Sequence, residues 1–301
     1  MFPIFAMKIL CLALLALAYN LVFGYGGLLA FGHAAFYGSA SYTAAHAAAV
    51  WGLSPELCIL AGVSVATGLG FGFGWLAIRR QGLYFAMITL ALAQIVYFYA
   101  LQSGWTHGED GIQSVPRGML FGLIDLSDTM SMYFVMLAVF LGGFALVYRI
   151  VHSPFGQTLK SIRENEARSI SLGYSTTRFK LLAFTLSAML AGLAGSMKAL
   201  VFQIASLADV YFMTSADALL MTLIGGVGTL LGPIVGAAVL VTLQTKLATF
   251  GAWVVVFQGA IFVLCVLFLR KGIVGTLEEF LANRRARRER LAASAKPEAA
   301  E

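Results

Sequence analysis

A few ionisable side chains lie in or beside long apolar stretches, where they could carry out transport chemistry. His33 and Asp217 lie within such stretches, and Lys198 and Lys246 lie near their ends. A charge inside a membrane is costly and usually functional, whereas a lysine near a helix end can extend its ammonium to the surface. A carrier coupled to protons or sodium would need several such groups deep in the membrane. His33 and Asp217 alone are too few to predict such a carrier. His33 would serve equally as a packing residue, and Asp217 as part of the outer mouth.

The sequence carries no recognisable catalytic or nucleotide-binding motif. Neither HExxH nor GxSxG occurs. The stretch GGVGTLLGP, which begins at Gly225, has the glycines of a phosphate loop but no Lys-Ser or Lys-Thr pair after it. The cysteines lie singly in apolar segments, so we expect neither a disulfide nor a metal site. Any driving energy must therefore come from a gradient or from another subunit.

The composition places most of this chain in lipid. It has 301 residues, of which 60% are hydrophobic and 11% charged, and its mean hydropathy is +0.86. Such a chain has more apolar surface than one water-soluble core can bury. The formal net charge of +6 does not predict nucleic-acid binding, because the basic residues fall in the gaps between apolar runs. We therefore expect an all-α polytopic membrane protein.

Apolar runs of about 20 residues predict the membrane spans. The candidates are residues 4–22, 57–77, 83–101, 130–148, 181–202 and 252–269. The first run, MKILCLALLALA, resembles a signal peptide, but no polar mature domain follows it. We therefore expect it to be retained as a span.

Basic residues predict which loops face the cytoplasm, because loops rich in Lys and Arg stay inside. Arg79 and Arg80, the segment 149–180 with six Lys or Arg, and the tail 270–301 with eight are expected inside.

Two segments poor in basic residues are expected outside. Residues 103–129 hold Arg117 against four acidic residues, and residues 203–217 hold no Lys or Arg. This alternation agrees with the spans that flank these segments. It also requires residues 212–247 to cross an even number of times, as a re-entrant or broken-helix hairpin would.

Two glycine-rich regions are too long to be simple spans: residues 24–50, with GYGGLLAFGHAAF, and residues 212–247, with GGVGTLLGPIVGA. Small residues let helix backbones approach closely in lipid. They also permit non-helical backbone, which membranes tolerate where it is buried or lines a cavity. We therefore expect both regions to be broken-helix or re-entrant segments around a pathway, the alternative being tight packing alone.

The cytoplasmic segment 149–184 is long for a connector and has its own helical pattern. Phe155, Leu159 and Ile162 recur at helical spacing, and Gly173 is positioned to end the helix. An amphipathic helix between two spans is a docking element for a soluble partner. The alternative is an interfacial helix that lies on lipid headgroups.

The sequence resembles the LivM-type permeases of branched-chain amino acid ABC importers. The blocks that carry the resemblance are SPFGQTLKSIRENEARSISLGYSTTRFKLLAFTLSAMLAGLAG, GYGGLLAFGHAAFYGSASYTAA, RRQGLYFAMITLALAQIV, GWTHGEDGIQSVPRG and LLMTLIGGVGTLLGPIVGA. They lie in family order between residues 12 and 275. The resemblance implies a permease domain over residues 1–275, with a coupling loop at 151–178 and a basic cytoplasmic tail at 276–301.

The resemblance also implies partners and site residues. A sister permease of the LivH type, two ABC ATPase subunits and a periplasmic binding protein would complete an importer in the bacterial inner membrane. ATP and Mg²⁺ would bind to the ATPases, and no cofactor to this chain. ATPase coupling is implied for Phe155, Gly156, Leu159, Glu164, Glu166 and Gly173. A place on the translocation pathway is implied for Gly24, Gly27, His33, Phe36, Gly225, Gly226, Gly228 and Gly232.

Several alternatives remain at this point. The family also includes permeases for urea, short amides and aromatic acids, and the substrate is chosen largely by the binding protein. A self-sufficient secondary carrier or channel would leave the long cytoplasmic loop unexplained. An intramembrane enzyme would need paired catalytic groups on facing spans, and the sequence offers none.

Overall fold

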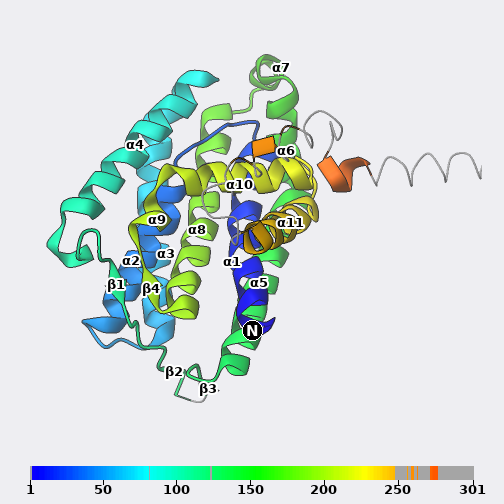
Figure 1. The fold of residues 1–301 in the computed structure, drawn as a ribbon. Coiled ribbons are helices and arrows are strands. Elements are labelled where there is room, and N and C mark those ends of the chain that lie inside the picture. The colour runs from blue at the N-terminus through cyan, green and yellow to red at the C-terminus, as the bar shows by residue number, and fades with distance from the viewer. Residues whose placement is uncertain are drawn as a thin grey trace, which may run out of the picture.

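The computed structural model describes residues 2–80, 82–122, 124–247, 256, 259–260, 263 and 272–276. Almost all of the expected span at 252–269, and the tail from residue 277, lie outside the described residues. The described chain is mostly helical, with very short strands at one end (Figure 1).

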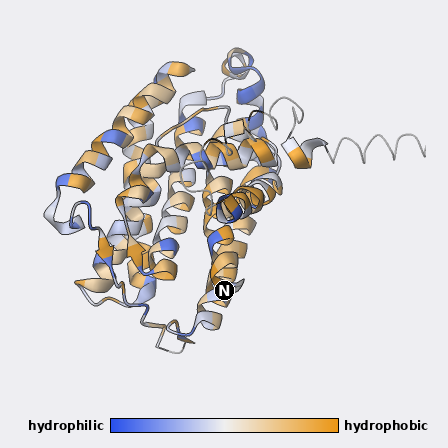
Figure 2. Cartoon of the chain, in the orientation of Figure 1, coloured by the Kyte–Doolittle hydropathy of each residue, from blue (hydrophilic) through white to orange (hydrophobic). Residues whose placement is uncertain are grey.

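Among the described residues, five helical segments are long and apolar enough to cross a membrane, which confirms five of the predicted spans. The first, Pro3–Tyr25, comprises most of α1 (Phe2–Asn20) and the π-helix η1 (Leu21–Tyr25). The others are α3 (Pro55–Ala77), α4 (Leu83–Gln102), α5 (Thr129–His152) and α8 (Thr176–Phe202). Figure 2 shows apolar residues along most of their length.

The centre of the bundle is formed by α1, α8 and α2 (His33–Ala49). The most apolar window is 61% buried in both α1 and α8, against 28% in α4 and α5. Small residues allow α2, α3 and α8 to pack closely. A Cβ on Gly195 of α8 would overlap the carbonyl oxygen of Tyr37 in α2, and one on Gly62 of α3 would lie 2.7 Å from the carbonyl oxygen of Ala40.

One end of the bundle holds the short strands and the acidic loop. There β1 (Ile112–Gln113) pairs antiparallel with β4 (Ile204–Ala205), and β2 (Met119–Leu120) pairs with β3 (Ile124–Asp125). Asp128 then caps α5 by accepting a hydrogen bond from the Ser131 N–H, which lowers the pKa of its carboxyl. This end contains residues 103–129 and the start of the segment 203–217, whereas residues 212–217 lie further toward the opposite end, where the Ser215 hydroxyl accepts a hydrogen bond from the Ala34 N–H (Figure 1).

The opposite end holds the loop that the charges predict to be cytoplasmic, here called the cytoplasmic loop, as two short helices, α6 (Pro154–Glu164) and α7 (Glu166–Ser171) (Figure 1). The sequence pattern predicted one helix that ends at Gly173. The helix instead breaks at Asn165, whose side chain accepts a hydrogen bond from the Arg168 N–H and so starts α7. Gly173 then follows α7 with a φ of +89°, as expected of a helix stop.

Both glycine-rich regions contain an interruption. In the first, residues 26–32 separate η1 from α2. The second follows α9 (Leu207–Val210) and consists of α10 (Phe212–Gly225) and α11 (Gly232–Leu247). The intervening residues 226–231, here called the tip, include Gly226 at φ +128° and Gly228 at φ +78°. Positive φ angles of this kind favour glycine.

Candidate functional site at the glycine-rich junction

The two glycine-rich regions meet in space although they lie far apart in the sequence. Gly24 of η1 touches the tip so closely that a Cβ on Gly24 would lie 2.7 Å from the backbone nitrogen of Gly228. We call this meeting point the junction, and it comprises Asn20, Gly24, Arg163, Gly228 and Thr229. Gly24 leaves no room for a Cβ at this contact, and Gly228 has a φ of +78°, which favours glycine.

Asn20 joins the two regions by hydrogen bonds. Its side-chain Nδ2 donates to the carbonyl oxygen of Thr229 at 2.8 Å, and its Oδ1 accepts from the Gly228 N–H at 3.0 Å. The residue is fully buried, so the amide replaces water for two backbone groups of the tip. Sequence reasoning missed Asn20, although a lone amide in the apolar run ALLALAYNLVFG was the available signal.

The predicted glycines on either side of the tip, Gly225 and Gly232, are closely packed. A Cβ on Gly225 would overlap the carbonyl oxygen of Gly232, and one on Gly232 would lie 2.6 Å from the carbonyl oxygen of Gly226. The Thr229 hydroxyl donates to the carbonyl oxygen of Gly226 at 2.9 Å and accepts from the Gly232 N–H at 3.1 Å. The tip is therefore a hydrogen-bonded turn without room for larger side chains.

Two basic residues of α6 reach η1. The Arg163 Nη1 donates a hydrogen bond to the carbonyl oxygen of Gly24. Gly27, at φ +69°, lies against the stem of the same arginine, where a Cβ would be 2.9 Å from Cγ. The Lys160 Nζ lies 5.5 Å from the centre of the Tyr25 ring, within the range of a cation–π contact. The cytoplasmic loop therefore contacts the first glycine-rich region directly.

His33 begins α2 and is fully buried. Its Nε2 lies 2.8 Å from the Ser187 Oγ, and the Ser187 hydroxyl donates its one hydrogen to the carbonyl oxygen of Ala18. His33 must therefore donate from Nε2, and Nδ1 is left without a hydrogen-bond partner among the described residues. The ring packs against Tyr19, Phe36 and Phe184, at centroid distances of 4.8, 5.8 and 6.1 Å. The structure thus places two predicted pathway residues, His33 and Phe36, in one aromatic cluster.

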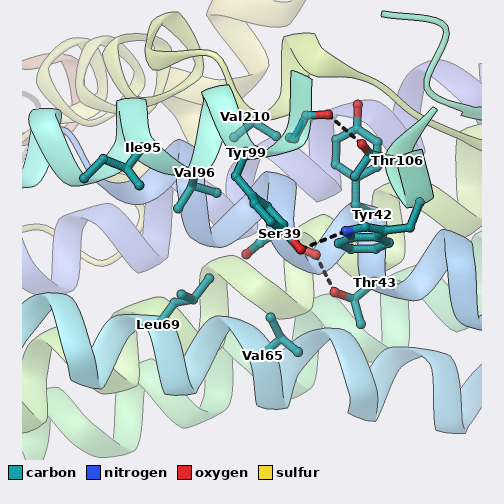
Figure 3. Close-up of a pocket in the computed structure, with 12 residues that line it drawn as sticks. Ser39, Tyr42, Thr43, Val65, Leu69, Ile95, Val96, Tyr99, Thr106 and Val210 are labelled. Atoms are coloured by element: carbon teal, nitrogen blue, oxygen red, sulfur yellow. Dashed lines mark hydrogen bonds between the residues drawn. The ribbon is translucent and has the colours of Figure 1, made fainter. Parts of the chain in front are cut away.

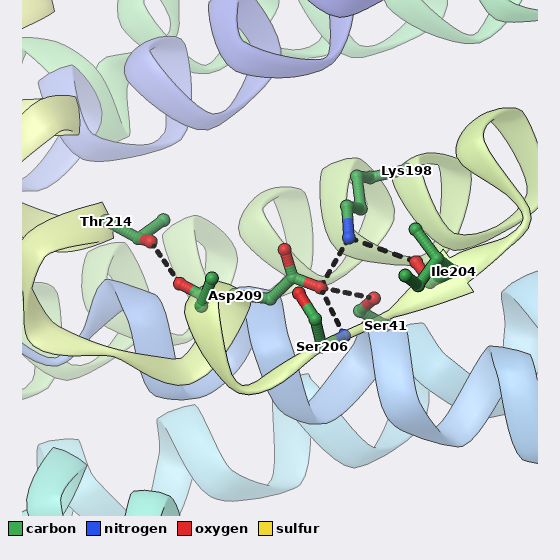
Figure 4. Close-up of polar contacts among 7 residues, drawn as sticks. Ser41, Lys198, Ile204, Ser206, Asp209 and Thr214 are labelled. Carbon is green, nitrogen blue, oxygen red and sulfur yellow. Dashed lines mark hydrogen bonds and ion pairs between the residues drawn. The ribbon is translucent and has the colours of Figure 1, made fainter. Parts of the chain in front are cut away.

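Lys198 does not extend to the surface, as the sequence suggested it could. Its Nζ lies 2.6 Å from the Asp209 carboxylate, and the two side chains are only 12% and 9% exposed (Figure 4). The same carboxylate accepts from the Ser41 hydroxyl at 3.3 Å and from the Ser206 N–H at 3.1 Å. The sequence analysis also missed Asp209. The capping pattern that starts at Ser206 was the available signal for it.

Asp217 lies on α10 and is half-buried. Its carboxylate accepts a hydrogen bond from the Gln244 Nε2 at 3.4 Å and so links α10 to α11.

An apolar groove lies between α2, α3 and α4 (Figure 3). Its volume is about 340 Å³. The Tyr42 hydroxyl in its wall is buried and has no hydrogen-bond partner within the described part of the chain. A second cavity, of about 460 Å³, lies beside the tip and is lined by Tyr25, Lys160, residues 228–231 and part of α5.

The predicted coupling residues of α6 face the protein itself. Leu159 is fully buried, and Phe155 stacks on Phe179 at a centroid distance of 5.6 Å. A Cβ on Gly156 would overlap the carbonyl oxygens of Ile150 and Val151. Their small or apolar side chains hold α6 against the bundle, and their contact with an ATPase stays a prediction.

The exposed part of the loop is α7 and the turn after it. Ile170, Leu172 and Tyr174 are 56%, 70% and 45% exposed. Glu166 is less exposed, because it pairs with the buried Lys180 at 2.6 Å, whereas Glu164 is exposed. Figure 2 shows polar residues around α7 at this end of the bundle.

A bundle of apolar helices, interrupted by two glycine-rich segments and carrying a helical loop at one end, defines a multi-pass membrane permease. The chain belongs to the family described as branched-chain amino acid transport system, permease component, which it matches over residues 2–266. As a permease component it is a transport subunit and not an enzyme.

Known relatives agree with this assignment. The chain is 31% identical over 285 residues to the high-affinity branched-chain amino acid permease protein LivM of Salmonella typhimurium, which covers 87% of this chain and 67% of that protein. LivM of Escherichia coli is 30% identical over 284 residues, with the same coverage. LivH of Salmonella typhimurium is 25% identical over 286 residues, or 88% of this chain and 92% of that protein. No solved structure matches the chain.

Proposed function

We propose that this chain is the LivM-type permease subunit of an ABC importer for branched-chain amino acids. It would form the path with a LivH-type sister permease, receive substrate from a periplasmic binding protein and be driven by two ATPase subunits. Residues 1–275 would form the membrane domain and residues 276–301 a basic tail inside the cell. ATP and Mg²⁺ would bind only to the ATPases. Family membership supports this proposal.

The exposed apolar patch of Ile170, Leu172 and Tyr174 carries the docking part of the proposal. These side chains lie at the end of the bundle that the positive charges assign to the cytoplasm, and not on a long apolar helix that lipid would cover. Arg168 and Glu164 flank them with charge. An apolar centre with a charged rim is typical of a protein interface. We therefore place the ATPase contact on α7, with the buried residues of α6 as its support.

A docking variant tests this assignment. Leu172→Asp puts a charge into the most exposed part of the patch, so we expect the ATPases to be lost when the permease pair is purified in detergent. Phe121→Asp is the matched control, because Phe121 is 71% exposed at the opposite end of the bundle. If the Leu172→Asp complex keeps its ATPases and its hydrolysis stimulated by loaded binding protein, α7 is not the docking element.

We also infer that α10, the tip and α11 form a re-entrant hairpin, and that the tip lines the path on its cytoplasmic side. Two observations support this: α10 has only 14 residues, and the tip lies beside α6 at the end that the charges predict to be cytoplasmic. A full span needs about 20 residues.

Substrate class is tested in proteoliposomes that contain the whole importer. Uptake of leucine, isoleucine and valine that requires ATP and loaded binding protein is the expected result. Uptake of urea, a short amide or an aromatic acid instead would assign the chain to another branch of the family. Uptake by this chain alone, without ATP, would support a secondary carrier.

A further inference from the structure

We propose that Arg163 is the positioning residue through which the cytoplasmic loop controls both glycine-rich segments. This inference rests on the proposed ATP-driven function. Arg163 belongs to α6, but it donates a hydrogen bond to the carbonyl oxygen of Gly24 in η1. Lys160, one turn earlier, lies over the ring of Tyr25. Two cations of one cytoplasmic helix thus hold consecutive residues at the end of one transmembrane segment.

The Arg163 contact is chemically strong because of where η1 ends. The last carbonyl groups of a helix have no partner within the helix, and the C-terminal end carries a partial negative charge. Gly24 lies in the last turn of the helical segment, and Arg163 brings a permanent positive charge to its carbonyl oxygen. The guanidinium therefore satisfies an acceptor and interacts favourably with the helix dipole.

Asn20 connects the end of the first transmembrane segment to the tip. Asn20, one turn before Gly24, binds both the Gly228 N–H and the Thr229 carbonyl. Gly24 and Gly228 also touch through their backbones. A displacement of η1 must therefore shift the tip as well, since the two segments share backbone contacts and hydrogen bonds.

The local structure permits such a displacement. A π-helix is a rare form with one extra residue in its hydrogen-bonded turn, and it is frequent at functional sites. Glycines at 24, 26 and 27 give η1 and its end little side-chain packing to lose. The cavity of about 460 Å³ beside Tyr25, Lys160 and the tip leaves space for movement on one side. Closely packed interiors, in contrast, resist such shifts.

These contacts connect the α7 patch to the tip in series. The ATPases bind the α7 patch and shift α6; Arg163 and Lys160 shift the end of η1; and Asn20 with Gly24 shifts the tip. A ligand can bias a conformational equilibrium only through contacts that differ between the two states. Arg163 makes the contact that would differ, because it joins the element that meets the ATPase to the element that lines the path.

Arg163→Ala is the first test, in the purified complete importer. We expect assembly with the ATPases and basal hydrolysis to be retained, while uptake falls by about tenfold or more, as for a typical coupling between sites. Arg163→Lys keeps a donor and a charge and should restore most of the uptake. Arg80→Ala is the matched control, because Arg80 is also exposed, follows α3 at a position that the charges predict to be inside, and lies outside the docking patch. An assembled Arg163→Ala importer with normal uptake would overturn the proposal.

A second measurement separates a coupling role from a merely structural one. Leu231 of the tip is 55% exposed, so a cysteine there can react with a thiol reagent. We expect its reaction rate to change between the ATP-free and ATP-bound importer, and this change to disappear in Arg163→Ala but persist in Arg80→Ala. A change that persists in Arg163→Ala refutes the inference. Failure of the wild-type importer to hydrolyse ATP would instead refute the proposed function.

Discussion

His33 illustrates how a single residue can look functional in a sequence and structural in three dimensions. A histidine inside an apolar segment indicates a pathway or relay. In the fold, however, the ring is fully buried, donates to Ser187 and is surrounded by aromatic rings. Only Nδ1 lacks a hydrogen-bond partner among the described residues. The geometry favours a packing role in this conformation.

Two substitutions of His33 distinguish packing from substrate contact. His33→Ala should lower the free energy of unfolding of the purified permease by about 2–4 kcal/mol, because it leaves a cavity among Tyr19, Phe36 and Phe184. His33→Phe fills the same space and should retain most of the uptake. If His33→Phe assembles normally but transports nothing, the imidazole acts on substrate and the packing interpretation is wrong.

At the scale of elements, the ion pair of Lys198 and Asp209 ties α8, α9 and α2 together. It lies in a poorly exposed region, where removal of one partner leaves an uncompensated charge. Asp209 additionally caps α9 through the Ser206 N–H. The pair therefore holds α9 against α8 and α2.

Removing only one charge of this pair should cost more stability than removing both. Asp209→Asn keeps the cap but leaves the Lys198 ammonium without its carboxylate partner. We therefore expect the free energy of unfolding to fall by about 3 kcal/mol or more. The double change Lys198→Met with Asp209→Asn should recover part of that loss. Thermal unfolding in detergent measures both, and a double variant less stable than Asp209→Asn would show that the pair is not a coupled unit.

The elements differ in how far the sequence could predict them. The spans α1, α3, α4, α5 and α8 follow from apolar length, because lipid imposes a fixed requirement on it. The break at Asn165 was missed, because the apolar period of Phe155, Leu159 and Ile162 lies wholly before Asn165 and gives no information about the cap there. Whether these apolar side chains pack against the protein itself or against a partner depends on the neighbouring helices. No local sequence pattern predicts this.

The junction was predictable only in part. The two regions were recognised from their glycine density, and the resemblance implied the single glycines. The structure gives close packing at Gly24, Gly225 and Gly232. Asn20 and Arg163 were missed as site residues, because their partners are backbone atoms more than a hundred residues away. A sequence pattern marks where small residues occur, but not which distant carbonyl will meet an amide or a guanidinium.

At the scale of the whole molecule, the two ends differ in charge and in structure. The acidic loop and the strands occupy one end, and α6 and α7 occupy the other (Figure 1). This arrangement has the same polarity as the predicted topology, with α7 inside the cell.

Single cysteines test the orientation in intact cells, in a chain whose native cysteines are replaced by serine. Ser114 and Ser171 are both exposed and lie at opposite ends of the bundle. An impermeant thiol reagent should label the Ser114→Cys variant and leave Ser171→Cys unlabelled until the cells are opened. Labelling of Ser171→Cys in sealed cells would reverse the orientation and remove α7 from the reach of a cytoplasmic ATPase.

The backbone contact of Gly24 with Gly228 also has a genetic consequence. A side chain on Gly24 would meet both the tip and Asn20, so a defect caused by Gly24→Ala has few routes to repair. We expect second-site suppressors of that allele to concentrate in residues 226–231 and at Asn20, where a small backbone or side-chain change can make room. A selection for restored growth on the transported nutrient would therefore map the contact without any purified protein.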